Sequence, residues 1–243
     1  MKNNQLSKWL QDQAIRLNCN LIGFAELNST TKKEICYSDY YIDDTPARYI
    51  IVLAMVLEDP IQDCWTQSPL WKKGKNFIDE VLARVGTLLA LKLTKIGYIC
   101  RMLRYDNVFL KNLAVHAGLG IIGRNNLLIT PQYGPHLRLR ALLTNAPLTP
   151  SLNLIGKFNP CSRCPEMPPC IKVCPSGAFK PAHQAGRNAP NHKQSPRSGY
   201  TKVLCRNYSR ANLREIGPYT YLWCRACEEA CPVGNETMYH SNK

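Results

Sequence analysis

The sequence predicts a layered domain of helices and strands, of α/β or α+β type, followed by a smaller domain built around cysteines. Strand-like and helix-like segments alternate through about residue 145, which is typical of a layered fold. Three prolines at 145–160 then indicate a junction. Eight of the twelve cysteines follow it, between Cys161 and Cys231. We therefore expect the domains to span residues 1–148 and 149–243.

The elements of the first domain follow from hydrophobic periodicity and β-branched content. Residues 48–57 form a nearly continuous apolar run, which predicts a strand covered on both faces. Gly118 follows a helix-like segment and suits the residue just after its end. The full set of predicted elements is helix 6–17, strand 21–27, strand 48–57, helix 71–95, strand 98–103, helix 109–117, strand 127–130 and strand 137–144.

The composition is that of an ordinary globular protein, with 45% hydrophobic and 20% charged residues. The longest apolar run, at 50–57, is far shorter than the roughly 20 residues that span a bilayer. The opening MKNNQLSKWLQDQ lacks the apolar core of a secretory signal. We expect a cytoplasmic protein without a membrane partner.

Two cysteine runs in the second domain have the spacing of metal ligands. The first is Cys161-x2-Cys164-x5-Cys170-x3-Cys174-Pro, and the second is Cys224-x2-Cys227-x3-Cys231-Pro, with Cys205 ahead of it. In two-cluster ferredoxins, the cysteine before proline serves the other cluster of the pair. This logic assigns one [4Fe–4S] cluster to Cys161, Cys164, Cys170 and Cys231, and the other to Cys174, Cys205, Cys224 and Cys227. Paired zinc sites and structural thiols are the alternatives.

The remaining cysteines are scattered singly through the first hundred residues, and we interpret them as packing residues or free thiols: Cys19, Cys36, Cys64 and Cys100. Residues 118–123 match G-x-G-x-x-G, but a predicted helix precedes them and a strand follows. A dinucleotide site requires the opposite order, so we reject that interpretation. A helix end with close backbone approach, or a loop that accepts a flat cofactor, remain as interpretations.

The formal net charge is +14, and no Asp or Glu occurs between Met167 and Arg214. Nine basic residues lie in this stretch: Lys172, Lys180, Arg187, Lys193, Arg197, Lys202, Arg206, Arg210 and Arg214. They either offset the negative charge of clusters on a solvated surface or bind an anionic partner such as RNA or an acidic protein. Residues 182–198, rich in small and polar residues, are predicted to form an exposed loop or a partly disordered segment.

Nearly the whole chain resembles the epoxyqueuosine reductase family. The similar segments are LNCNLIGFAEL at 17–27, RYIIVLAMVL at 48–57, LAVHAGLGIIGRNNLLITPQYGP at 113–135 and the Cys-Pro runs with the isolated Cys205. The family is related to reductive dehalogenases. The resemblance implies a cobalamin in the N-terminal domain, reduced by two clusters in a ferredoxin-like domain, and a modified nucleoside of tRNA as substrate. It also implies a catalytic acid, whose register position is Arg104 and for which Asp106 is the nearest candidate proton donor.

Three functional hypotheses follow. The first is an iron–sulfur oxidoreductase that passes electrons from a donor protein through two clusters to cobalamin and on to an electrophilic substrate. The second is a ferredoxin-type electron carrier, or a corrinoid-reducing activator, that docks on an acidic partner. The third is an RNA-binding protein whose clusters are structural.

Overall fold

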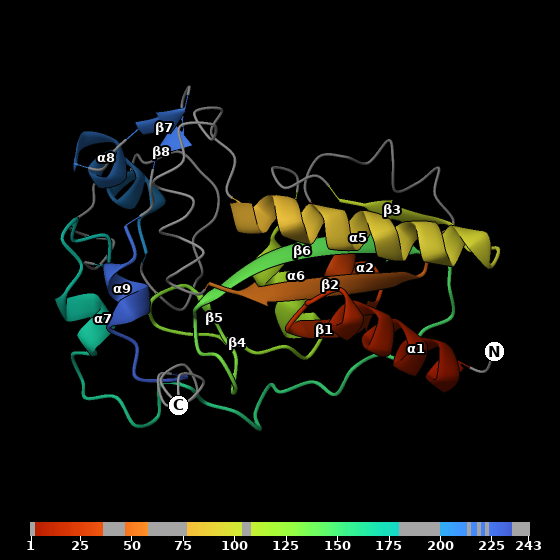
Figure 1. Cartoon of the computed structure of the whole chain (residues 1–243). Coiled ribbons are helices and arrows are strands. Elements are labelled where there is room, and N and C mark those ends of the chain that lie inside the picture. The colour runs from red at the N-terminus through yellow and green to blue at the C-terminus, as the bar shows by residue number, and fades with distance from the viewer. Residues whose placement is uncertain are drawn as a thin grey trace, which may run out of the picture. The chain divides into compact units, whose positions relative to one another are not determined.

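The computed structural model describes residues 3–35, 47–57, 77–103, 108–179, 200–212, 215–217, 220–221 and 224–234 (Figure 1). The chain divides into two compact units. The first comprises Met1–Glu58, Phe77–Gly120 and Leu137–Lys157, and the second contains Ile121–His136 and the described residues from Phe158 onward. The predicted boundary between residues 148 and 149 stays a prediction. Outside the described residues lie the predicted helix start at 71–76, the predicted loop at 182–198, Arg104, Asp106, Cys36 and Cys64.

The first unit contains a four-stranded sheet in the order β1-β2-β6-β3. Its strands are β1 (Leu21–Glu26), β2 (Tyr49–Val56), β6 (Leu137–Thr144) and β3 (Cys100–Met102). Every pairing is antiparallel, and β2 pairs with β6 over eight residues from Tyr49↔Thr144 to Val56↔Leu137. Of the two predicted fold types, the mixed α+β arrangement is therefore the one adopted.

Helices cover both faces of this sheet. A Cβ atom on Gly86, in helix α5 (Phe77–Lys95), would lie 3.7 Å from Leu53 and 3.8 Å from Leu142, so α5 packs on the face that carries these leucines. A Cβ atom on Gly23 would instead collide with the carbonyl oxygen of Ala117, just after α6 (Leu110–His116). Since Gly23 pairs with Val52, one residue from Leu53, α6 covers the opposite face. This explains why seven consecutive residues of β2 are buried.

Helix α1 (Asn3–Arg16) packs against β1 and α5, and its apolar stripe of Leu6, Leu10 and Ala14 is fully buried. The Ser7 hydroxyl accepts a hydrogen bond from the Thr149 amide at 2.8 Å, which fixes the chain that leaves β6. The short helix α2 (Ser29–Lys32) begins with a capping box, in which Asn28 accepts from the amides of Thr30 and Thr31.

The glycine stretch at 118–123 begins as a helix end. Gly118 has φ of +71°, and its amide donates to the Val115 carbonyl at 3.0 Å while the Leu119 amide donates to Ala114 at 2.9 Å. These two bonds are the Schellman motif that ends a helix. Helix α6 precedes the glycines and strand β5 (Leu128–Ile129) follows Gly123, as predicted, whereas the short strand β4 (Ile121–Ile122) within the stretch was not predicted. The glycines at 118 and 123 are explained by close packing, because a Cβ would collide with Leu152 or with Ile129.

The second unit has short elements. Strand β4 pairs with β5 (Leu128–Ile129), and β7 (Glu215–Gly217) pairs with β8 (Thr220–Tyr221). Its helices are α7 (Pro169–Lys172), α8 (Lys202–Asn212) and α9 (Ala226–Glu229). Within the described ranges of the whole chain, no helix has the length and apolar character required to cross a membrane.

Candidate metal centre

The first predicted cysteine run is held by a turn and a short helix of the second unit. Asn159 caps the turn, since its side chain accepts from the Cys161 amide at 3.2 Å, and the Cys164 amide then donates to the Cys161 carbonyl at 3.3 Å. Cys170 follows Pro169, the first residue of α7, where proline is compatible with a helix. The usual ferredoxin run is C-x2-C-x2-C-x3-C-Pro, so the x5 interval before Cys170 has three extra residues. This longer interval ends with Pro169, where α7 begins.

The second run is built around α9. Cys224 precedes this helix, Cys227 lies within it, and the buried Cys231 follows it. Cys205 lies on α8, and α9 packs against α7. All eight predicted cysteines are therefore described by the structure, and each is a free thiol.

Electrostatic neighbours sort the thiols into two sets. Burial raises the pKa of Cys231 to about 11, and the thiols that raise it further are Cys170, Cys161 and Cys164. Burial also raises the pKa of Cys227 to about 12, and its further thiol neighbours are Cys205, Cys174 and Cys224. A thiolate raises the pKa of another thiol only at short range, so these pKa increases show which thiols lie near one another. The two sets have the same members as the two ligand sets that the sequence predicts.

This donor set fits iron–sulfur clusters chemically, because each cluster requires four convergent thiolates. Bound iron would favour the thiolate form of these cysteines. Among the described residues, no three His, Cys, Asp or Glu side chains are arranged to hold a single metal ion directly. An iron–sulfur cube spaces its ligands more widely than one ion does, so the assignment of clusters to the two sets stays a proposal.

Arg124 connects the segment Ile121–His136 to the first thiol set. Its backbone amide donates to the Sγ atom of Cys161 at 3.4 Å. Its guanidinium donates to the carbonyl oxygens of Pro165 and Glu166 at 3.4 and 3.1 Å. These carbonyls lie between Cys164 and Cys170, so one residue holds both the first thiol and the loop that follows the second.

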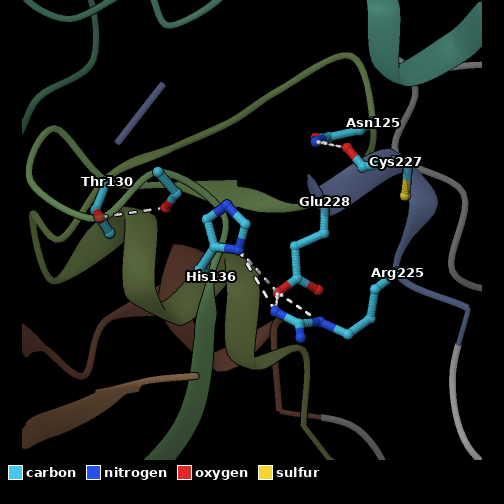
Figure 2. A network of polar contacts seen from close by, with 7 residues as sticks. Asn125, Thr130, His136, Arg225, Cys227 and Glu228 are labelled. Carbon is cyan, nitrogen blue, oxygen red and sulfur yellow. Dashed lines mark hydrogen bonds and ion pairs between the residues drawn. The ribbon is translucent and has the colours of Figure 1, made fainter. Parts of the chain in front are cut away.

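The same segment also holds the second run. The side chain of Asn125 is buried and donates to the carbonyl of Cys227 at 3.4 Å (Figure 2). Further along, Gly134 and Gly234 meet backbone to backbone, because a Cβ on either glycine would overlap the main chain of the other segment. Both have positive φ, which makes glycine the residue suited to each position. Ile121–His136 is thus a frame that contacts both cysteine runs.

A buried charge network lies beside two of the thiols. The Arg225 guanidinium donates to Glu228 Oε1 at 3.0 Å, and His136 Nδ1 lies 3.5 Å from the same oxygen (Figure 2). The side chains of His136 and Glu228 are only 5% and 8% exposed. Arg225 directly follows Cys224, and Glu228 directly follows Cys227. The network therefore ties the end of the frame to the short helix that carries the second run.

Tyr200 makes a hydrogen bond to the Cys205 side chain. Burial raises the pKa of Tyr200, so the phenol keeps its proton and donates a hydrogen bond to the sulfur. The ring packs against Phe179 with centroids 5.4 Å apart. Sequence reasoning missed Tyr200, Arg124, Asn125 and His136 as site residues. A usable signal existed for two of them, since Arg124 and Asn125 directly follow Gly123 in the stretch that carries the family resemblance.

The other predicted residues lie apart from the thiol sets. Burial raises the pKa of Cys19 to about 11 and that of Cys100 to about 12, and both belong to the first unit. Each is a protonated thiol that packs within that unit, in agreement with its interpretation as a packing or free thiol. Asp106 and Arg104 lie outside the described residues, so the role of either as the catalytic acid stays a prediction.

Comparisons with known proteins identify two related groups. A tetrachloroethene reductive dehalogenase of Desulfitobacterium hafniense is 29% identical over 154 residues, which are 62% of this chain and 27% of that protein. An epoxyqueuosine reductase of Listeria monocytogenes is 30% identical over 132 residues, which are 53% of this chain and 30% of that protein. The chain is a divergent relative of both groups. No family model matches it.

Solved structures of the same two groups share the fold. An epoxyqueuosine reductase from Bacillus subtilis aligns with a TM-score of 0.66 at 18% identity, over 98% of this chain and 68% of that one. A reductive dehalogenase whose structure suggests a mechanism for B12-dependent dehalogenation aligns with a TM-score of 0.67 at 15% identity, over 99% of this chain and 34% of that one. The sequence matches span less than a third of the length of these curated relatives.

Proposed function

We propose that the chain is a cytoplasmic iron–sulfur oxidoreductase that carries electrons through two [4Fe–4S] clusters to a cobalamin and from there to an electrophilic substrate. One observation carries the proposal: eight thiols from two distant runs form two sets of four electrostatic neighbours. The ligands of one cluster would be Cys161, Cys164, Cys170 and Cys231. The ligands of the other would be Cys174, Cys205, Cys224 and Cys227. Such clusters supply one-electron redox chemistry when bound.

The chain's own residues have definite tasks in this proposal. The Arg124 amide donates to one thiol and the Tyr200 hydroxyl to another, and hydrogen bonds to cluster sulfurs are among the features that set a cluster's reduction potential. The frame Ile121–His136 contacts both runs and would position them around the clusters. Burial of Cys170 and Cys231 limits the access of water to the first set.

The cobalamin part of the proposal is supported by the similar proteins. Among the described residues, the glycine stretch that could have bordered a flat cofactor does not do so. Gly118 and Gly123 lie against Leu152 and Ile129 instead of bordering open space, so neither marks a surface for a flat cofactor. One neighbouring structure is an epoxyqueuosine reductase solved with an epoxyqueuosine-modified tRNA stem loop, at 18% identity and a TM-score of 0.64. A nucleoside of tRNA is therefore the first substrate class to test, with Asp106 as the candidate proton donor.

The test is oxygen-free purification followed by iron, sulfide and cobalt analysis, with cobalamin offered during purification. The proposal predicts about eight irons and eight sulfides per chain and retention of a corrinoid. Cys231→Ser and Cys205→Ser should each reduce the iron content to about half, because each removes a ligand of a different cluster. Cys19→Ser is the matched control and should keep all the iron. Zinc in place of iron would refute the clusters.

A second candidate function is a ferredoxin-type electron carrier, or an activator that reduces the corrinoid of another protein. It is favoured by the exposed basic residues on α8, the helix that carries Cys205. In this case the purified chain would contain about eight irons but would retain no corrinoid. Electron delivery to an added acidic corrinoid protein would then distinguish a carrier from the reductase.

A further inference from the structure

Helix α8 carries three cations at a regular spacing. Lys202, Arg206 and Arg210 are all exposed and follow one another at intervals of four residues. Residues four apart lie on the same side of an α-helix, about 6 Å apart along its axis. The helix contains no Asp or Glu. The three side chains therefore form one basic stripe along α8.

The same helix presents a different side to the second thiol set. Cys205 and Ser209 are also four residues apart, and Ser209 is 3% exposed. Cys174, Cys224 and Cys227 are the electrostatic neighbours of Cys205. One helix thus offers a redox ligand on its buried side and positive charge on the adjoining exposed side. A partner that contacts the stripe would therefore lie within one helix diameter, roughly 10 Å, of the Cys205 side of the helix.

We infer that the basic stripe of α8 is the docking surface for an acidic electron-transfer protein that reduces the second cluster. The inference rests on the proposed function and names the partner's chemistry and its place of contact. Charge complementarity favours this occupant, since the sequence has no acidic residue from Met167 to Arg214 to repel it. The closeness of the stripe to Cys205 favours a redox protein over RNA, because phosphate binding gains nothing from a neighbouring cluster. One electron leaves the reduced donor and enters the second cluster, and no bond forms or breaks.

Stopped-flow measurement of cluster reduction tests the surface. The full chain is loaded with iron and sulfide without oxygen and mixed with a reduced, strongly acidic ferredoxin at several salt concentrations. Arg206→Glu should lower the second-order rate constant about three- to tenfold at low salt, and high salt should remove most of this difference. Arg84→Glu is the matched control, since Arg84 is also an exposed arginine within a helix, and it should change the rate little.

A second variant removes the positive charges without introducing negative ones, so that a change in rate is not caused by unfolding of α8. Lys202→Gln/Arg206→Gln/Arg210→Gln keeps good helix formers and should slow reduction by the ferredoxin about tenfold or more. Photoreduced deazaflavin, a small reductant that needs no docking, should reduce this variant and the unmodified chain at equal rates. If the triple variant is reduced by ferredoxin at an unchanged rate, the inference is overturned. If that variant also loses RNA binding, the stripe binds RNA instead. If the unmodified chain assembles no clusters, the proposed function fails. If it assembles clusters and only the ferredoxin rate is unaffected by the substitutions, the docking surface alone fails.

Discussion

In the first compact unit, whole strands and helix faces are buried, whereas in the second the described residues meet through hydrogen bonds, an ion network and thiols. Seven residues of β2 are buried, together with the fully buried leucines at 6, 10, 82, 89 and 113. Among the described residues of the second unit, the buried apolar side chains are fewer and mostly small: Leu128, Ile129, Pro135, Pro160, Pro168, Cys170, Ala178 and Cys231. Since buried apolar area is the main source of stability, we expect the first unit to fold by itself and the second to depend on the clusters proposed for it.

Removal of iron and sulfide should give the largest effect and test this comparison directly. In the iron-free chain, the amides of α7 and α9 should lose their protection from hydrogen exchange, while those of β2 and β6 keep it. Hydrogen–deuterium exchange measured by mass spectrometry resolves these segments. Equal protection of α7 and α9 with and without iron would mean that protein contacts alone stabilise the second unit.

The buried ion network should be the most sensitive protein contact of the second unit. Glu228→Leu leaves the Arg225 charge buried without its carboxylate, which costs about 3–5 kcal/mol. The neighbouring Glu229 is exposed, so Glu229→Leu is the matched control and should cost little. Denaturant titration of the iron-loaded chain, followed through its visible absorbance, measures both. If the two variants lose iron at the same denaturant concentration, the network does not stabilise this unit.

Packing in the first unit should respond to a single methyl group. Gly23→Ala places a Cβ against the Ala117 carbonyl and Leu119, and we expect a loss of about 1–3 kcal/mol in unfolding free energy. The control is Gly86→Ala, whose Cβ would meet the Met102 sulfur at 3.2 Å, the flexible end of a side chain. Because alanine also favours a helix interior, this variant should be neutral or slightly stabilising. Equal losses in the two variants would argue against tight packing of α6 on the sheet.

The smallest expected effect is a loss of stability at high pH. Burial raises the pKa of Cys19 from its ordinary value of 9.0 to about 11, so the unfolded chain releases this proton first as the pH rises. The stabilising contribution is complete below pH 9 and should fall by about 1.4 kcal/mol per pH unit at most up to pH 11. Urea titrations of the first unit between pH 8 and pH 10.5 measure the slope. It should flatten in Cys19→Ala/Cys100→Ala, and an unchanged slope would exclude the two thiols as its origin.

The sequence predicted the first unit well because its signals are local. Strand 137–144 was predicted with the bounds that β6 has, and 48–57 contains β2 as a strand buried on both sides. The antiparallel order of the strands could not be predicted, since it depends on contacts between distant segments. Helix α8 was missed because residues 202–212 contain few large apolar side chains, although the helix does separate its polar from its apolar residues.

The same distinction applies to the candidate site. Cysteine spacing predicted two ligand sets because most ligands of an iron–sulfur cluster recur at short, fixed intervals along the chain. The contacts of Arg124, Asn125 and His136 with the cysteine runs join residues 37 to 102 positions apart, and no local pattern encodes such a distance. Residue type alone gave no indication either, because arginine and asparagine are mostly surface residues; the position of Arg124 and Asn125 directly after Gly123 was the one usable signal.

The path of the chain has a consequence for synthesis on the ribosome. The chain leaves the first unit after Gly120 and returns at Leu137, where β6 supplies the strand that pairs with both β2 and β3. The sheet therefore cannot close until residues 121–136 have already emerged. Because all eight cysteines of the two runs come later in the chain, the sheet can close and fix both ends of the frame before they emerge. The cysteines that emerge later would then meet a frame that is already anchored. This would shorten the time during which they are exposed to oxidation or to the wrong metal.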